Sequence, residues 1–137
     1  MKAITYLLFS GNCEAALKFY EQAIGASIRH LFHYRGSPME SQVPTQMKDK
    51  VLHAVIDIGD GVLMASDRVG RTGSDEMTGF SIVLDAKTPE DAERLLAALA
   101  VEGRITTPLQ ETFWARRFGM VIDQFGVPWM INCEKPM

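Results

Sequence analysis

The segment from Glu111 to Asn132 reads ETFWARRFGMVIDQFGVPWMIN and contains both tryptophans of the chain. Its later part holds two apolar runs of strand length, FGMVID and VPWMIN, separated by the short turn Gln124-Phe125-Gly126, a pattern typical of a β-hairpin. The tripeptide Val121-Ile122-Asp123 also occurs earlier as Val55-Ile56-Asp57, in another hairpin pattern around Gly59-Asp60-Gly61. The repeated hairpin indicates that one structural unit occurs twice in the chain.

The elements before each hairpin also follow the same order. The run AITYLLFS predicts a strand, and Asn12 and Gly25 are suited to cap and end the helix that follows. In the second half, FSIVLD predicts a strand, and Thr88 caps a helix that Gly103 ends. A further strand pattern follows each helix, ASIRHLFHY in the first half and RITTPL in the second.

Each half therefore reads strand–helix–strand–loop–strand–strand, and the first half carries the longer loop, between Tyr34 and Lys50. Two copies of a βαβββ unit predict an α+β fold in which two small sheets share a core and each carries one helix on the outside. We expect a single domain over residues 1–137, with module one at about residues 1–70 and module two at about residues 76–137.

The composition is that of an ordinary soluble globular protein, with 47% hydrophobic residues, 23% charged residues and a net charge of −3. No basic stripe is present that would neutralise a row of phosphates, so nucleic-acid binding is not expected. No stretch comes close to the ~20 apolar residues that a membrane span needs, and the N-terminus lacks a secretory apolar core. Cys13 and Cys133 stand alone, which favours free thiols in a reducing cytosol. These features predict a cytoplasmic protein.

Three stretches carry a resemblance to a known family: FSGNCEAALKFYEQAIGA, HAVIDIGDGVLMASD and, most specifically, ETFWARRFGMVIDQFGVPWMIN. With them the chain resembles the vicinal oxygen chelate superfamily, the glyoxalase/bleomycin-resistance/dioxygenase fold, and more narrowly its PhnB-like branch. The resemblance implies a curved eight-stranded sheet made by two βαβββ modules, with a cleft inside it and the helices outside. It also implies a homodimer.

Metal-using members of this superfamily bind the ion with four ligands, each a His, Gln or Glu. One ligand comes from each of four strands, the first and the last strand of each module. The resemblance places at these positions Thr5, Met64, Phe80 and Met130. None of the four is a usable ligand for a hard or borderline divalent ion. A shift of one residue would turn the opposite side chains into the cleft, but the neighbouring residues supply no His or carboxylate either. We therefore expect these residues to line a cleft without a metal and without a cofactor.

Other residues are assigned to the core or to the cleft by their position on a strand. In VPWMIN, alternation puts Trp129 on the core side and Asn132 on the face of Met130, where Asn132 orients a polar ligand group or binds a backbone amide. Pro128 cannot donate a ladder hydrogen bond, so its strand is expected to be at an edge or broken there. Trp114 lies in the loop after TTPL and is expected to face either a ligand or a dimer interface.

The polar candidates for catalysis are His53 and Glu111. His53 stands at the head of the strand HAVIDIG and is either a proton-transfer group or a histidine bonded to the backbone. Glu111 is a general base if an apolar cleft raises its pKa. The alternative for Glu111 is an ion pair with Arg116 or Arg117.

Three aspartates are expected to have structural roles. Asp57 and Asp123 occupy matching positions of the repeated tripeptide, so we expect both to fix the turn that follows. Asp67, at the end of LMASD, is expected to form a turn at the end of a strand.

The sequence leaves three functions open. The first is a PhnB-like protein that transforms a small, partly apolar molecule without a metal. The second is a non-catalytic protein that sequesters a small molecule or drug, as in bleomycin resistance. The third is a metal-dependent lyase or dioxygenase, which the residues at the four cleft positions disfavour.

Overall fold

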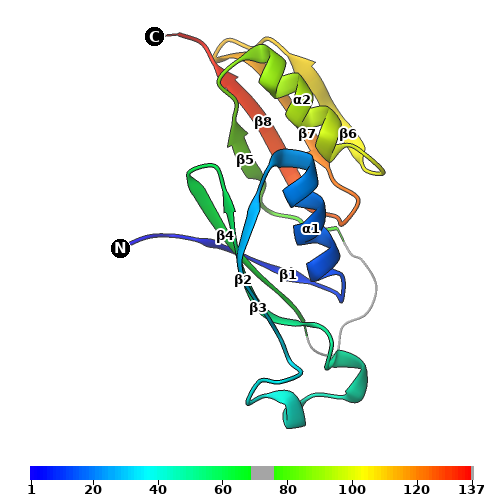
Figure 1. The fold of residues 1–137 in the computed structure, drawn as a ribbon. Helices are drawn as coiled ribbons and strands as arrows, with labels where there is room; N and C mark the ends of the chain where they lie inside the picture. Colours follow the sequence, from blue (N-terminus) through cyan, green and yellow to red (C-terminus); the bar gives the residue numbers. More distant parts are fainter. Residues whose placement is uncertain (69–75, 137) are drawn as a thin grey trace. The chain divides into compact units, whose positions relative to one another are not determined.

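The structure, a computed structural model, describes residues 1–68 and 76–136 of the chain. The chain divides into two compact units, Met1–Ser74 and Asp75–Met137. Figure 1 shows a four-stranded sheet and an α-helix in each unit. Among the described residues, no helix is long and apolar enough to cross a membrane.

The first unit is a four-stranded mixed sheet with one α-helix. Its main elements are β1 (Thr5–Phe9), α1 (Cys13–Ile24), β2 (Ser27–His33), β3 (Val51–Ile58) and β4 (Gly61–Asp67). The strand order is β1-β4-β3-β2, in which β1 runs parallel to β4 and the other neighbours are antiparallel. The long loop predicted between β2 and β3 is present, and it includes two short 3₁₀ helices, η1 (Glu40–Gln42) and η2 (Thr45–Met47).

The second unit repeats this arrangement. Its elements are β5 (Ile82–Asp85), α2 (Pro89–Leu99), β6 (Arg104–Gln110), β7 (Ala115–Ile122) and β8 (Pro128–Glu134). The strand order is β5-β8-β7-β6, again with the first strand parallel to the last and the other neighbours antiparallel. The predicted α+β fold with two βαβββ modules is therefore confirmed.

The core of each unit lies between its helix and one side of its sheet. The helix residues buried there are Cys13, Ala16, Leu17 and Tyr20 on α1, and Ala92, Leu96 and Leu99 on α2. Strand residues alternate in exposure because successive side chains point to opposite sides; on β1, Leu7 is buried whereas Tyr6 and Leu8 are exposed. Each sheet thus has a second side that its own helix does not cover, which we call its helix-free face.

Strand β8 tests the predictions for Trp129 and Pro128. Trp129 is fully buried on the helix-facing side, as predicted. The prediction of an edge strand is wrong, because β8 is an inner strand that pairs with β5 on one side and β7 on the other. Pro128 is the first residue of β8, a position that a residue without an N–H tolerates.

The two Val-Ile-Asp tripeptides are not structurally equivalent. Val55 pairs with Met64 on the helix-free face of the first unit, whereas Val121 pairs with Trp129 on the helix-facing side of the second. Because side chains alternate along a strand, the two copies are out of register by one residue. The duplication is real, but it rests on the order of the elements and not on this tripeptide.

Asp67 fixes the start of α1. It is 2% exposed, and its Oδ1 accepts hydrogen bonds from the backbone N–H groups of Gly11 at 2.9 Å and Cys13 at 3.0 Å. Its Oδ2 accepts a third from the N–H of Val51 at 2.9 Å. The predicted cap residue, Asn12, makes no side-chain cap bond. Asp67 is therefore a long-range helix cap and not the local turn residue expected from the sequence.

Asp123 fixes the turn between β7 and β8, as predicted. It is 3% exposed, and its Oδ1 accepts hydrogen bonds from the N–H groups of Phe125 at 2.8 Å and Val127 at 3.0 Å. Its Oδ2 accepts one from the indole Nε1 of Trp129 at 2.8 Å. Asp57 does not have this role, since it lies within β3 and forms an exposed ion pair. For Asp57 the prediction is wrong.

Candidate functional site

The helix-free face of the first unit carries a hydrogen-bonded pair of side chains. The hydroxyl oxygen of Tyr6 on β1 lies 3.0 Å from Nδ1 of His53 on β3. The two rings are stacked, with centroids 5.7 Å apart and planes inclined by 24°. The sequence predicted either a catalytic His53 or one bonded to the backbone. The partner is instead the phenol of Tyr6, a residue without a role predicted from the sequence.

Apolar side chains accompany this pair on the same face. Tyr6 pairs across the sheet with Met64, and Phe32 on β2 pairs with His53. Leu8 and Phe32 are 44% and 55% exposed. Exposed apolar surface around a small number of placed polar groups is typical of ligand-binding sites.

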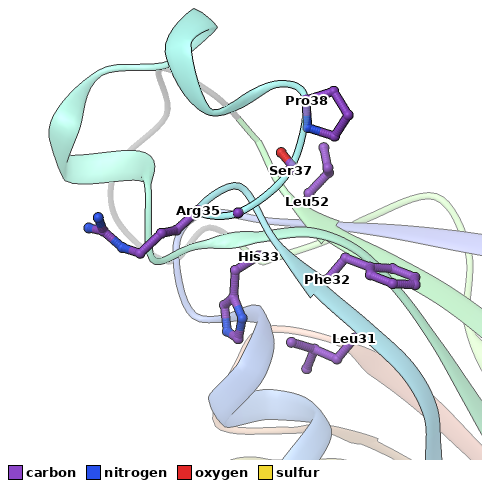
Figure 2. A pocket seen from close by; sticks show the side chains of 8 residues that line it. Leu31, Phe32, His33, Arg35, Ser37, Pro38 and Leu52 are labelled. Carbon is purple, nitrogen blue, oxygen red and sulfur yellow. The ribbon is translucent and has the colours of Figure 1, made fainter.

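A cavity of about 420 Å³ lies at β2 and the start of the β2–β3 loop, and Figure 2 shows the side chains that line it. It is lined by Leu31, Phe32, His33, Arg35, Gly36, Ser37, Pro38 and Leu52. Phe32 lines the cavity and also pairs with His53 across the sheet, so it belongs both to the cavity wall and to the helix-free face. The volume falls within the range of roughly 300–1,000 Å³ that is usual for small-molecule sites.

The start of the β2–β3 loop forms one wall of the cavity. Gly36 has a φ of +85°, a backbone conformation that favours glycine. The hydroxyl of Ser37 donates to the carbonyl of Tyr34 at 2.6 Å and accepts from the N–H of Met39 at 3.1 Å. The cavity was not predicted, because the sequence of this region indicates only an irregular loop. The turn signal in Gly36-Ser37-Pro38 was the available clue.

The two basic side chains beside the cavity are already paired. Arg35 Nε lies 2.7 Å from Asp49 Oδ1, and His33 Nε2 lies 2.8 Å from Glu14 Oε1. The hydrogen bond from Arg35 lowers the pKa of Asp49 from its ordinary value, and the bond from His33 does the same for the pKa of Glu14. Because both side chains are already bonded to carboxylates, the cavity offers a mainly apolar surface.

In the first unit, the predicted cleft positions need a correction by one residue. Thr5 pairs with Leu63, which is buried on the helix-facing side. Tyr6 is the β1 residue that pairs with Met64. The register therefore places Tyr6 and Met64 together on the helix-free face and Thr5 on the helix-facing side.

A similar correction holds in the second unit. Phe80 precedes β5, and Val83 is the β5 residue that pairs with Met130. A valine and a methionine do not fit a hard or borderline metal ion. In residues 1–68 and 76–136, no group of three or more His, Cys, Asp or Glu side chains is suited to hold a metal ion. The side chains present thus do not match the metal site of the metal-using relatives.

Asn132 lies on the helix-free face of the second unit, together with Met130. It stands between Asp85 on β5 and Phe118 on β7. Its Nδ2 donates to Asp85 Oδ1 at 3.2 Å, and its Oδ1 is buried with no hydrogen-bond partner among the described residues. The bond to a backbone amide, one of the two predicted alternatives, is not formed among the described residues, and the role in orienting a ligand group stays a prediction.

Trp114 is 47% exposed in the loop between β6 and β7. Its ring meets those of Phe113 and Phe118 edge to face, with centroid distances of 4.9 Å and 5.3 Å. The three aromatic rings form an exposed cluster, which is compatible with either role predicted for Trp114.

Glu111 has a different environment from the one its predicted role requires. Its carboxylate lies 3.3 Å from Lys135 Nζ, and its side chain is 68% exposed. The predicted ion pair with Arg116 or Arg117 is wrong, because these guanidinium groups donate to backbone carbonyl oxygens. The exposed carboxylate of Glu111 thus lacks the apolar surroundings that its predicted role requires.

Known proteins resemble this chain in sequence and in fold. The chain is similar to protein YjdN of Escherichia coli strain K12, with 37% identity over 138 residues, 95% of this chain and 93% of that protein. It shares the fold of protein PA1353 from Pseudomonas aeruginosa, with 40% identity, 99% of both chains and a TM-score of 0.86. The PhnB protein from Bacillus cereus has a like fold, with 24% identity, 97% of this chain, 99% of that chain and a TM-score of 0.74. Because the model of the Glyoxalase/Bleomycin resistance protein/Dioxygenase superfamily matches residues 3–131, the chain belongs to this superfamily, as its sequence predicted.

Proposed function

We propose that the chain binds or transforms a small, partly apolar molecule without a metal ion, on the helix-free face of the first unit. The observation that carries this proposal is the hydrogen bond between Tyr6 and His53. It is a polar pair on an exposed apolar face, and Phe32 on that face also lines a cavity of about 420 Å³. A few placed polar groups within apolar surroundings orient a small ligand.

The surrounding side chains favour a ligand of variable shape. Phe32 supplies a rigid aromatic surface, and Met64 supplies a flexible thioether that adapts to irregular ligands. If the bound molecule reacts, His53 is the group placed to exchange a proton with it. Glu111 is less suited to this task because its exposed carboxylate is already paired with Lys135.

Binding is tested with a thermal-shift screen of metabolites and drugs, followed by titration of the best compound. We expect His53→Gln to weaken its binding by about tenfold, because a hydrogen bond to the ligand is lost or misplaced. Asp60→Ala is the control, since it changes a polar side chain in an exposed turn of the same unit, at the end of β3 away from His53, and it should leave affinity unchanged. Equal affinity of wild type and His53→Gln for every compound found would contradict the proposal.

The same titrated compound separates an enzyme from a binding protein. If the protein is an enzyme, product accumulates with the wild type and ceases with His53→Gln. If it sequesters its ligand, binding is saturable and the molecule is recovered unchanged. The second outcome corresponds to the drug-sequestering function left open by the sequence.

A metal-dependent lyase or dioxygenase is the remaining alternative. The positions that correspond to the metal ligands are occupied by two neighbouring pairs of residues, Tyr6 with Met64 and Val83 with Met130. We therefore expect elemental analysis of the purified protein to give no stoichiometric Zn, Ni, Mn or Fe. One equivalent of any of these metals, retained after dialysis, would restore this alternative.

We also propose that the protein is a cytoplasmic homodimer. The strands β2 and β6 end the order of their sheets, and open sheet edges are commonly paired or covered in a homo-oligomer. In such a dimer the exposed cluster of Phe113, Trp114 and Phe118 has a role either in the interface or against the ligand.

A further inference from the structure

We propose that Tyr6 holds His53 as the neutral tautomer protonated at Nε2, so that the site presents a hydrogen-bond donor. The ligand class that fits is an apolar molecule with an acceptor oxygen, such as an aryl ketone. This inference deepens the proposed function and rests on it for the place where the ligand binds. It assigns Tyr6 as a positioning residue, which acts through His53.

The direction of the Tyr6–His53 hydrogen bond follows from the two groups that share it. The contact joins the phenol oxygen to Nδ1 at 3.0 Å, so one of the two must supply the proton. An imidazole nitrogen with a free lone pair is far more basic than a phenol oxygen, as the imidazolium pKa of about 6.5 indicates. The phenol therefore donates, and Nδ1 of His53 accepts.

This direction determines the state of the other ring nitrogen. A neutral imidazole has one N–H, so an accepting Nδ1 requires the proton to be on Nε2. The only hydrogen bond of the His53 ring to any described residue is the one to Tyr6. The ring is half-buried, and its Nε2–H remains available to a bound molecule.

The neighbouring surface sets the rest of the ligand. Phe32 pairs with His53 across the sheet, and both Phe32 and Leu8 are substantially exposed. These side chains offer apolar surface to a ligand and have no acceptor that would compete for the Nε2–H of His53. A molecule with an aromatic or aliphatic body and one carbonyl oxygen satisfies both parts of the surface. Toward such an oxygen the neutral His53 acts as a donor that polarises the C=O bond, and not as a base.

The tautomer is measured directly by NMR of the ¹⁵N-labelled ligand-free protein, at a pH well above the imidazole pKa of about 6.5. We expect His53 Nδ1 to resonate as an unprotonated nitrogen and Nε2 as a protonated one, with the ring assigned by its loss in His53→Gln. Tyr6→Phe should shift both resonances toward values averaged over the two tautomers. His30 and His33 are internal controls, and Asp60→Ala, in an exposed turn, should change none of the three rings.

A His53 that carries its proton on Nδ1, or averages between tautomers in the wild type, overturns the assignment of Tyr6. Such a result would leave the proposed function standing, because binding at this face does not require a particular tautomer. The measurement needs no ligand, so its outcome is distinguishable from a failure of the binding screen.

The ligand class is tested with two probes of nearly equal shape, acetophenone and α-methylstyrene, in which a CH₂ group replaces the carbonyl oxygen. We expect acetophenone to bind about tenfold more tightly and to shift the Nε2–H resonance of His53. In His53→Phe the two probes should bind equally. Acetophenone that does not bind, or binds no more tightly than α-methylstyrene to the wild type, overturns the acceptor-bearing ligand class.

Discussion

Replacing Asp67 with alanine is expected to lower the free energy of unfolding by about 3–5 kcal/mol. The carboxylate is 2% exposed and accepts three backbone hydrogen bonds, from Gly11, Cys13 and Val51. Hydrogen bonds to a charged group contribute about 1.5–3 kcal/mol each, and buried N–H groups left without a partner add a cost. The total is smaller than the sum because the three bonds share one acceptor group.

Urea unfolding followed by circular dichroism measures this change. Asp60→Ala is the control, since it also removes an aspartate of the first unit but from an exposed turn, and its midpoint should match the wild type. Asp67→Asn should also be destabilised, because only the oxygen of an amide accepts hydrogen bonds and its NH₂ group cannot replace the second carboxylate oxygen. A midpoint of Asp67→Ala equal to that of Asp60→Ala would show that the carboxylate does not hold β4, β3 and α1 together.

Replacing Asp123 with alanine is expected to cost a similar amount, about 3–5 kcal/mol. The change leaves the N–H groups of Phe125 and Val127 and the indole N–H of Trp129 without their acceptor. Trp129 is fully buried, so its N–H has no access to water as a substitute. The turn between β7 and β8 loses its anchor at the same time.

Asp57→Ala is the matched control for this substitution, because it alters the other copy of the Val-Ile-Asp tripeptide. Asp57 forms an exposed ion pair with Arg29, and exposed ion pairs contribute little to stability. Its urea midpoint should therefore stay close to that of the wild type. Equal destabilisation by Asp57→Ala and Asp123→Ala would mean that the two copies are equivalent, contrary to the register.

The order of elements was predictable because each signal is local. Thr88 caps α2 through a bond from the N–H of Asp91 to its Oγ1 at 3.1 Å, and Gly25 ends α1 with a φ of +71°. Both depend on residues next to the helix end. The cap of α1 was missed because Asp67 is distant in sequence, and no local pattern links a helix start to the end of β4.

The side of the sheet on which each strand residue lies was harder to predict than the position of the strands in the sequence. A shift of one residue exchanges the two sides of a sheet, and this shift separates Thr5 from Tyr6 on β1. In the second unit, the predicted strand began too early, which placed Phe80 where Val83 belongs. The apolar runs mark where a strand lies, but only pairing with the neighbouring strand fixes which residues share a face.

The candidate site was predictable only in part for the same reason. His53 could be selected as a polar residue at the head of a strand, and its partner could not, because Tyr6 comes from a strand that reaches β3 only across β4. The cavity depends on the fold of the loop at Gly36 and Ser37, which has no periodic pattern. A site whose residues come from separate strands and an irregular loop can be recognised only when the structure is known.

The most direct test of the proposed site is to map where a small molecule binds, with the amide and side-chain resonances of the protein assigned and the best compound of the screen added stepwise. We expect the largest shifts at His53, Tyr6 and Phe32, on one face of the first sheet. Shifts confined to the second unit, with those three residues unchanged at saturation, would contradict it.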